Sequence, residues 1–247
     1  MKKIHKIMLA KPSCTWFNVR SWTLVPYSLA LIRAVIPDKY EINILEPNLE
    51  SLTVEQTRQR IKDFHPDLIG VSCSSIEYSK SAHKLAELVK QIDPSTVVIF
   101  GGVYGTATPE LPMKDKNVDF VILGEGERRL PKFLKMAEER DEDFTKFDGI
   151  AYRKNGQVII NPIERFIEDL DTLPLPAYDK FNYRAYCNEN DKFSNVLLPR
   201  YYPYAVMSTS RGCPFSCIYC STHAIDGKKT RFKSAERVLE EKRLASK

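Results

Sequence analysis

The chain has 247 residues, of which 43% are hydrophobic, and a formal net charge of +5 at neutral pH. This composition is typical of a globular protein and argues against a long disordered region. No apolar run is long enough to cross a bilayer, and the run "IMLA" near the start is too short for a signal peptide. We therefore expect a cytoplasmic protein, whose six cysteines are thiols or metal ligands rather than disulfides.

The positive charge is concentrated at the C-terminal end. From Arg211 onward there are nine lysines and arginines against four acidic residues, which accounts for the whole excess. Nucleic-acid binding is one interpretation of such a basic segment. A solvated helix face with a few groups near an anionic ligand is the simpler one, and we expect no nucleic-acid partner.

Strand and helix patterns alternate through the first 140 residues. Buried-strand patterns occupy residues 5–10, 40–47, 66–75, 96–102 and 118–127. Helix patterns follow them or lie between them, at residues 26–36, 53–64, 81–92 and 129–139. This alternation predicts a parallel sheet covered on both faces, in a flavodoxin-like, doubly wound α/β domain over residues 1–140.

Three of the expected strands end in small residues. The stretch "SCSS" ends the third strand, "GGVYGT" follows the fourth and "GEGE" follows the fifth. In doubly wound sheets, ligands bind at the carboxyl ends of the strands. Glycine and serine let a ligand approach the backbone closely and supply amide and hydroxyl donors, so we expect a ligand at this edge.

The pattern changes beyond residue 140. A hairpin around Asn155 and Gly156 and a proline-rich segment, "DLDTLPLPAYDKF", form an expected linking region over residues 141–200. The stretch "YAVMSTS" then predicts a new strand, in a C-terminal portion that spans residues 201–247.

Three cysteines, Cys213, Cys217 and Cys220, follow that strand with the spacing C-x3-C-x2-C. Thiolates gather in one loop when they hold one metal centre. On a four-iron cluster, three thiolates leave one iron open for an external ligand. A structural zinc would need a fourth protein ligand, for which His223 is a candidate. The spacing alone leaves both metals open.

The cysteine loop, with Tyr219 just before its last cysteine, resembles that of the radical S-adenosylmethionine (SAM) enzymes. The resemblance implies a 4Fe-4S cluster on the three cysteines, SAM on the open iron, and Tyr219 against the adenine. It favours iron–sulfur over zinc. It also implies cleavage of SAM to a 5′-deoxyadenosyl radical, an electron donor such as flavodoxin or ferredoxin, and a small-molecule substrate.

Upstream, "GG-x-x-x-T", "VDFVILGEGE" and "DLDTLPLPAYD" extend the resemblance to the cobalamin (B12)-binding radical SAM proteins, from the first strand to about residue 240. That family includes methyltransferases acting on unactivated carbon or phosphorus and the anaerobic Mg-protoporphyrin monomethyl ester cyclase. It implies a B12-binding domain, a linker and the opening of a radical SAM partial TIM barrel. The implied cobalamin contacts are Ser72, Ser74, Gly101, Gly102, Tyr104, Thr106, Gly124, Glu125 and Gly126.

The sequence departs from the family pattern at three points. The D-x-H-x-x-G motif is missing, so we expect no lower axial histidine, and His5, His65 and His83 are expected at the surface or in the core. Tyr104 stands where many relatives have histidine. The chain also stops one helix after the cysteine loop, so we expect a truncated barrel and a chain that is incomplete for catalysis.

Three alternative functions stay open from the sequence. A methylthiotransferase-like protein would hold a second cluster in the first domain, where Cys14 and Cys73 follow the first and third strands but a third cysteine is absent. The chain could also be a non-catalytic cobalamin-binding remnant or a zinc-binding protein.

Four other side chains have both a ligand-binding and a structural interpretation. Glu125 and Glu127 either contact a ligand or complement the dipole at the start of a helix. Trp16 and Trp22 either line the cobalamin face or pack in the core.

Overall fold

The computed structural model describes residues 3–19, 26–182, 185–186 and 206–245. Trp22, the start of the strand predicted at "YAVMSTS", and Cys187 lie outside these ranges. In the described ranges, no helix combines the length and the apolar character that a membrane crossing requires.

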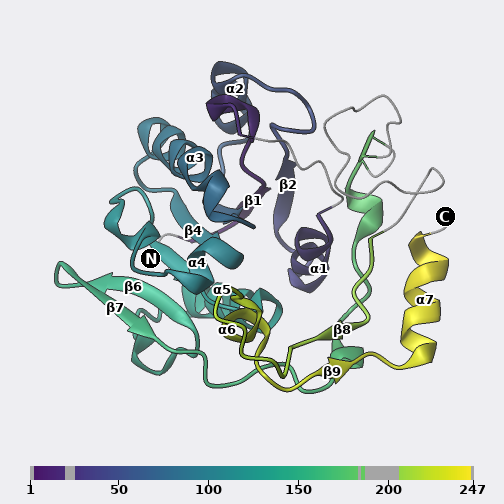
Figure 1. Cartoon of the computed structure of the whole chain (residues 1–247). Helices are drawn as coiled ribbons and strands as arrows, with labels where there is room; N and C mark the ends of the chain where they lie inside the picture. The colour runs from purple at the N-terminus through teal and green to yellow at the C-terminus, as the bar shows by residue number, and fades with distance from the viewer. Residues whose placement is uncertain (1–2, 20–25, 183–184, 187–205, 246–247) are drawn as a thin grey trace.

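A seven-stranded sheet forms the centre of the fold, in the order β2-β1-β3-β4-β5-β6-β7 (Figure 1). The first five strands pair in parallel, in the order expected of a flavodoxin-like, doubly wound sheet. The predicted fold class is therefore confirmed. These strands are β1 Lys6–Ala10, β2 Glu41–Leu45, β3 Leu68–Ser72, β4 Val97–Gly101 and β5 Phe120–Ile122.

Helices cover both faces of the sheet, and two separate apolar cores result. Along β1, Ile7 belongs to the core under α1 and α5, whereas Met8 belongs to the core under α2 and α3, because successive side chains of a strand point to opposite faces. The helices are α1 Tyr27–Val35, α2 Val54–Phe64, α3 Ser79–Ile92, the short α4 Val103–Ala107 and α5 Gly126–Glu139.

The hairpin of β6 (Ile150–Lys154) and β7 (Gln157–Asn161) extends the main sheet. From the sequence it is expected in the linking region, but β6 pairs antiparallel with β5, in a register that sets Val121 opposite Ala151. Both of these residues are fully buried in one core. The pairing follows because β5 would otherwise be an open edge next to an apolar hairpin.

The C-terminal part contains β8 Ser210–Arg211, α6 Thr222–Asp226, β9 Arg231–Phe232 and α7 Ala235–Ala245. The strand predicted at "YAVMSTS" is wrong in length, since residues 206–209 are not strand and β8 holds only two residues. Its partner β9 supplies only two residue pairs, and Gly212 turns the backbone directly after β8. Figure 1 shows this strand pair apart from the main sheet.

Candidate functional site

A cleft with a volume of about 340 Å³ opens at the carboxyl ends of β3, β4 and β5. The small residues that end these strands form its floor, as expected from the sequence. Seven of the nine predicted cobalamin contacts line it, namely Ser72, Ser74, Gly101, Gly102, Gly124, Glu125 and Gly126.

The cleft is hollow because its floor carries few side chains. A Cβ atom on Gly101 would meet nothing closer than the Ile122 carbonyl oxygen, at 4.0 Å, so it would project into the open space. Gly70, in the middle of β3, also lines the cleft, and a Cβ there would lie 3.3 Å from the Leu9 Cδ2 atom. A flat ligand can therefore reach the backbone of these strands, which fits a nucleotide tail.

Gly102 has a different role from Gly101. Its φ is +86°, and a Cβ atom would lie 2.7 Å from the carbonyl oxygen of Cys73. That carbonyl accepts a hydrogen bond from the Tyr104 amide, at 3.1 Å, which begins α4 against the end of β3. The backbone itself thus requires glycine at position 102, whether or not a ligand is bound.

Tyr104 and Thr106 do not line the cleft. The Tyr104 hydroxyl lies 3.1 Å from His83 Nε2 on α3, and His83 Nδ1 lies 2.6 Å from an Asp115 carboxylate oxygen. Thr106 acts through the backbone, because its hydroxyl accepts a hydrogen bond from the Gly124 amide at 2.8 Å. Thr106 thus holds the loop after β5, whereas the Tyr104 side chain contacts α3.

Trp16 also lies away from the cleft. Its indole Nε1 donates to the Leu52 carbonyl oxygen at 2.9 Å, and its ring packs against the core under α2 and α3. The structural interpretation therefore holds for this tryptophan.

The walls of the cleft come from elements far apart in the sequence. One wall is α1, with Tyr27, Ser28 and Ile32, and another is the first turn of α5, with Glu127. The outer wall belongs to the C-terminal segment, and the sequence patterns gave no signal for it. Its lining residues are Ser208, Ser210, Arg211, Ile225 and Asp226.

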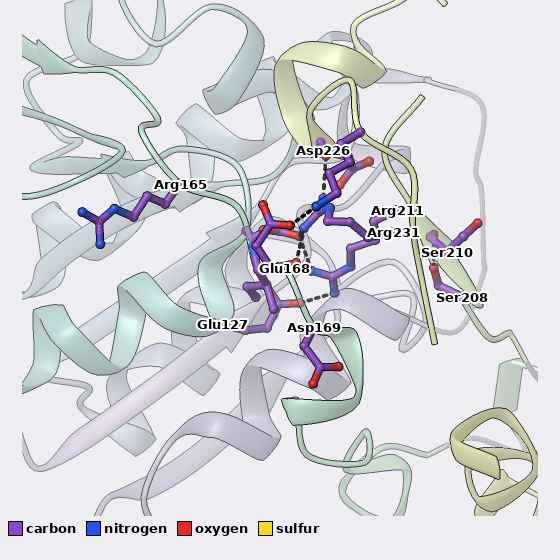
Figure 2. Close-up of polar contacts among 12 residues, drawn as sticks. Glu127, Arg165, Glu168, Asp169, Ser208, Ser210, Arg211, Asp226 and Arg231 are labelled. Atoms are coloured by element: carbon purple, nitrogen blue, oxygen red, sulfur yellow. Dashed lines mark hydrogen bonds and ion pairs between the residues drawn. The ribbon is translucent and has the colours of Figure 1, made fainter. Parts of the chain in front are cut away.

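A buried ionic network joins this outer wall to α5 (Figure 2). Arg211 Nη1 lies 3.0 Å from Glu125 Oε1, and Arg211 Nη2 lies 2.5 Å from Glu127 Oε1. Arg231 Nη1 lies 2.8 Å from the same Glu125 oxygen, and both of these side chains are 2% exposed. The other Glu125 oxygen accepts the Ile167 amide at 2.7 Å. Glu125 and Glu127, which lie at the start of α5, thus contact arginines of the C-terminal segment.

A second buried contact joins the C-terminal segment to α1. Lys233, beside β9, donates to the Tyr27 hydroxyl at 2.7 Å and forms an ion pair with Glu241 of α7. The Tyr178 hydroxyl donates to the other Glu241 oxygen at 3.2 Å. Burial, followed by the nearby Glu241 carboxylate, raises the pKa of Tyr27 above its ordinary value. The C-terminal segment is thereby fixed to both helical walls of the cleft.

The three cysteines of the C-x3-C-x2-C loop are free thiols, with Cys217 exposed and the other two half-buried. The Cys213 amide donates to the Gly227 carbonyl oxygen at 3.1 Å, which anchors the start of the loop next to α6. A hydrogen bond with the Thr222 hydroxyl, at 3.2 Å, lowers the pKa of the Cys220 thiol. Tyr219 is 89% exposed.

The donor set of this loop fits a metal cluster, because three thiols without disulfides lie within eight residues. Among the residues that the structure describes, no three side chains of histidine, cysteine, aspartate or glutamate are gathered in a metal-binding arrangement. In this structure the three thiols are therefore not gathered around one point, either among themselves or with His223 of α6.

Cys14 and Cys73, the cysteines considered for a second cluster, are both fully buried. Burial raises the pKa of the Cys73 thiol to about 12, which disfavours the thiolate that a metal requires. Cys73 is better explained as a small buried residue that ends β3.

None of the four histidines of the chain, all of which the structure describes, lines the cleft. We therefore expect cobalamin bound to this chain to lack a protein nitrogen ligand below cobalt. An electron paramagnetic resonance spectrum of the Co(II) state with 15N-labelled protein checks this. A nitrogen splitting pattern that changes between unlabelled and labelled protein contradicts the prediction.

Comparisons with known proteins identify the family that this chain resembles. A sequence model of the B12 binding domain matches residues 19–134. Over 242 residues the chain is 32% identical to an uncharacterized methyltransferase of Pyrococcus horikoshii, covering 97% of this chain and 50% of that protein. It is 26% identical over 185 residues to the anaerobic magnesium-protoporphyrin IX monomethyl ester cyclase of Rubrivivax gelatinosus, covering 73% and 31%.

The fold is also shared with a solved structure. The cobalamin-dependent S-adenosylmethionine radical enzyme OxsB matches with a TM-score of 0.73 and 19% identity, over 97% of this chain and 31% of that chain. The chain is thus an α/β protein with a B12-binding domain. It is a relative of the cobalamin-binding radical SAM methyltransferases and cyclases, so the family resemblance is confirmed. It spans half of the methyltransferase's length and less of the cyclase's.

Proposed function

We propose that this chain binds cobalamin, with the nucleotide tail of the cofactor in the cleft. We also propose that Cys213, Cys217 and Cys220 hold a 4Fe-4S cluster, whose open iron would bind SAM. The observation that supports the cobalamin site is the cleft itself, whose floor lies within the matched B12-binding region and is formed by backbone at the carboxyl ends of three parallel strands. The complete protein would perform radical methyl transfer to an unactivated carbon. Methyl transfer is preferred to cyclisation because the methyltransferase match covers more of the chain.

The residues of the chain have separable tasks in this proposal. The glycines and serines of the cleft floor admit the nucleotide tail, and the outer wall from Ser208 to Arg211 keeps water from it. The three thiols would hold the iron–sulfur cluster. When bound there, the cluster would supply the electron for the cleavage of SAM. The exposed ring of Tyr219 is available to the adenine. A reduced flavodoxin or ferredoxin, a cytoplasmic location and a small-molecule substrate complete the proposal.

Filling the cleft tests the cobalamin site directly. Gly101→Leu places a side chain in the open space without straining the backbone, whereas a change at Gly102 would strain it. We expect the affinity for methylcobalamin to fall roughly tenfold or more, because overfilling a packed site costs about 1–3 kcal/mol. A spectroscopic titration of the purified protein measures it.

The control introduces the same residue outside the cleft. Val158→Leu, on the exposed face of β7, should leave the affinity at the wild-type value. Equal affinity of the Gly101 variant and the wild type would show that cobalamin does not use this cleft.

A further inference from the structure

Arg211 occupies a position between the two candidate cofactor sites. It lines the cleft, and it precedes the first cysteine of the loop by two residues. Its guanidinium contacts Glu125 through Nη1 and Glu127 through Nη2, so both ends of the fork are held. Figure 2 labels Arg211 and Glu127. A guanidinium held at both nitrogens has a fixed orientation, which a lysine ammonium would not have.

The connection from Arg211 to Cys213 is short and stiff. The intervening Gly212 has a φ of +88°, and a Cβ atom on it would lie 2.1 Å from the carbonyl oxygen of Lys229. The Cys213 amide is in turn hydrogen-bonded to Gly227, at the end of α6. The backbone from Arg211 to Cys213 is therefore packed against Lys229 and Gly227, which limits how far Arg211 can shift without moving Cys213.

The connection on the other side, from Arg211 to the cleft floor, is equally direct. Glu125 lies between the two glycines that follow β5, and all three residues line the cleft. A Cβ on Gly124 would lie 3.2 Å from the Ile225 carbonyl oxygen, so α6 packs directly on this loop. A ligand that orders the loop after β5 also orders the carboxylates that hold Arg211.

Buried ion pairs add little net stability, because desolvation offsets most of their attraction. Their better-supported role is to select one arrangement of the elements that they join. Here the Arg211 side chain is 13% exposed and the Glu127 side chain 7% exposed, so the network is shielded from water.

We propose that Arg211 is a positioning residue that couples the two cofactor sites. Occupation of the cleft by a nucleotide tail fixes Glu125 and Glu127, and through Arg211 it fixes the backbone of Cys213. Because coupling is reciprocal, an ordered cysteine loop also favours the ligand in the cleft. This inference rests on the proposed cobalamin site.

Alkylation of the metal-free protein measures the coupling without enzymatic turnover. Each protein is saturated with methylcobalamin in the dark, at a concentration set by its own titration. N-ethylmaleimide labelling of Cys213 is then followed by mass spectrometry, with and without the ligand. In the wild type we expect the ligand to slow labelling roughly fivefold or more, the lower limit of typical coupling between sites. Glu127→Gln and Arg211→Gln should abolish this protection.

The matched control is Lys229→Gln. Lys229 joins the same segment to the body of the chain through Glu168, at 2.5 Å, but that pair is exposed and away from the cleft. In the Lys229→Gln variant, methylcobalamin should slow the labelling of Cys213 as much as in the wild type. A purely structural role of Arg211 would change the labelling rates with and without ligand equally, and so would leave their ratio unchanged.

The outcomes separate the two proposals. Equal protection in the wild type and in Glu127→Gln would show simple shielding by the ligand, and would overturn the coupling while the cobalamin site stands. A wild type that binds methylcobalamin without protection overturns the coupling in the same way. A wild type that does not bind methylcobalamin overturns the cobalamin site and the coupling together. If Arg211→Gln does not fold, Glu127→Gln decides.

Discussion

Anaerobic reconstitution with iron and sulfide should give the wild-type chain a broad iron–sulfur absorption, which Cys213→Ala, Cys217→Ala and Cys220→Ala each abolish. The effect is all-or-none because three thiolates from one loop are the only protein ligands that the proposal assigns to the cluster. A cluster held by two thiolates has two open irons and is lost to solvent and chelators. Absorption spectra and iron content per chain measure the result.

Two other cysteines are the controls for this experiment. Cys14 is fully buried under α2 and α3, and Cys187 lies outside the C-x3-C-x2-C loop. Cys14→Ala and Cys187→Ala should both retain the absorption. A wild-type chain that holds one zinc ion and takes up no iron would contradict the iron–sulfur assignment. Loss of the absorption in Cys14→Ala would instead favour a second cluster of the methylthiotransferase kind.

Glu125→Ala should lower the free energy of unfolding by about 3–5 kcal/mol, the range for removing one partner of a buried ion pair. Glu125 accepts hydrogen bonds from Arg211, Arg231 and the Ile167 amide, and its side chain is 2% exposed. Its removal leaves the Arg231 guanidinium buried without a carboxylate. Urea unfolding followed by circular dichroism measures the change.

Glu168→Ala is the control for stability. It removes an ion pair that also involves the C-terminal segment, between Lys229 and Glu168 of the linking region, but both side chains are largely exposed. Exposed ion pairs contribute little to stability, so the unfolding midpoint should not move. Equal destabilisation by the two variants would show that burial of Glu125 is not what makes its ion pairs important.

Much of the fold and part of the site follow from local sequence patterns. The five parallel strands could be predicted because apolar periodicity reports which short segments are buried. The position of the cleft could be predicted because parallel strands bring their carboxyl ends to one edge, where "SCSS", "GGVYGT" and "GEGE" lie. The cysteine loop is likewise a local feature, since its three thiols lie within eight residues.

The tertiary structure decided which of these residues face the cleft and what surrounds them. Gly101 and Gly102 are neighbours in sequence, but one leaves space for a ligand and the other is required by a backbone contact with Cys73. Tyr104 turns toward His83 rather than into the cleft. Such directions depend on the elements packed around each residue, so the spacing in the sequence does not reveal them.

Long-range pairing accounts for the remaining differences. The hairpin at β6 joins the sheet because β5 offers it an open edge, and the length of β8 is limited by its two-residue partner β9. Arg211 meets Glu125 and Glu127 across separations of 86 and 84 residues. The sequence by itself determined where strands, small-residue loops and thiols occur, because those depend on neighbouring residues. The tertiary structure decided which distant charges share one buried site, because that depends on how the C-terminal segment packs against the start of α5.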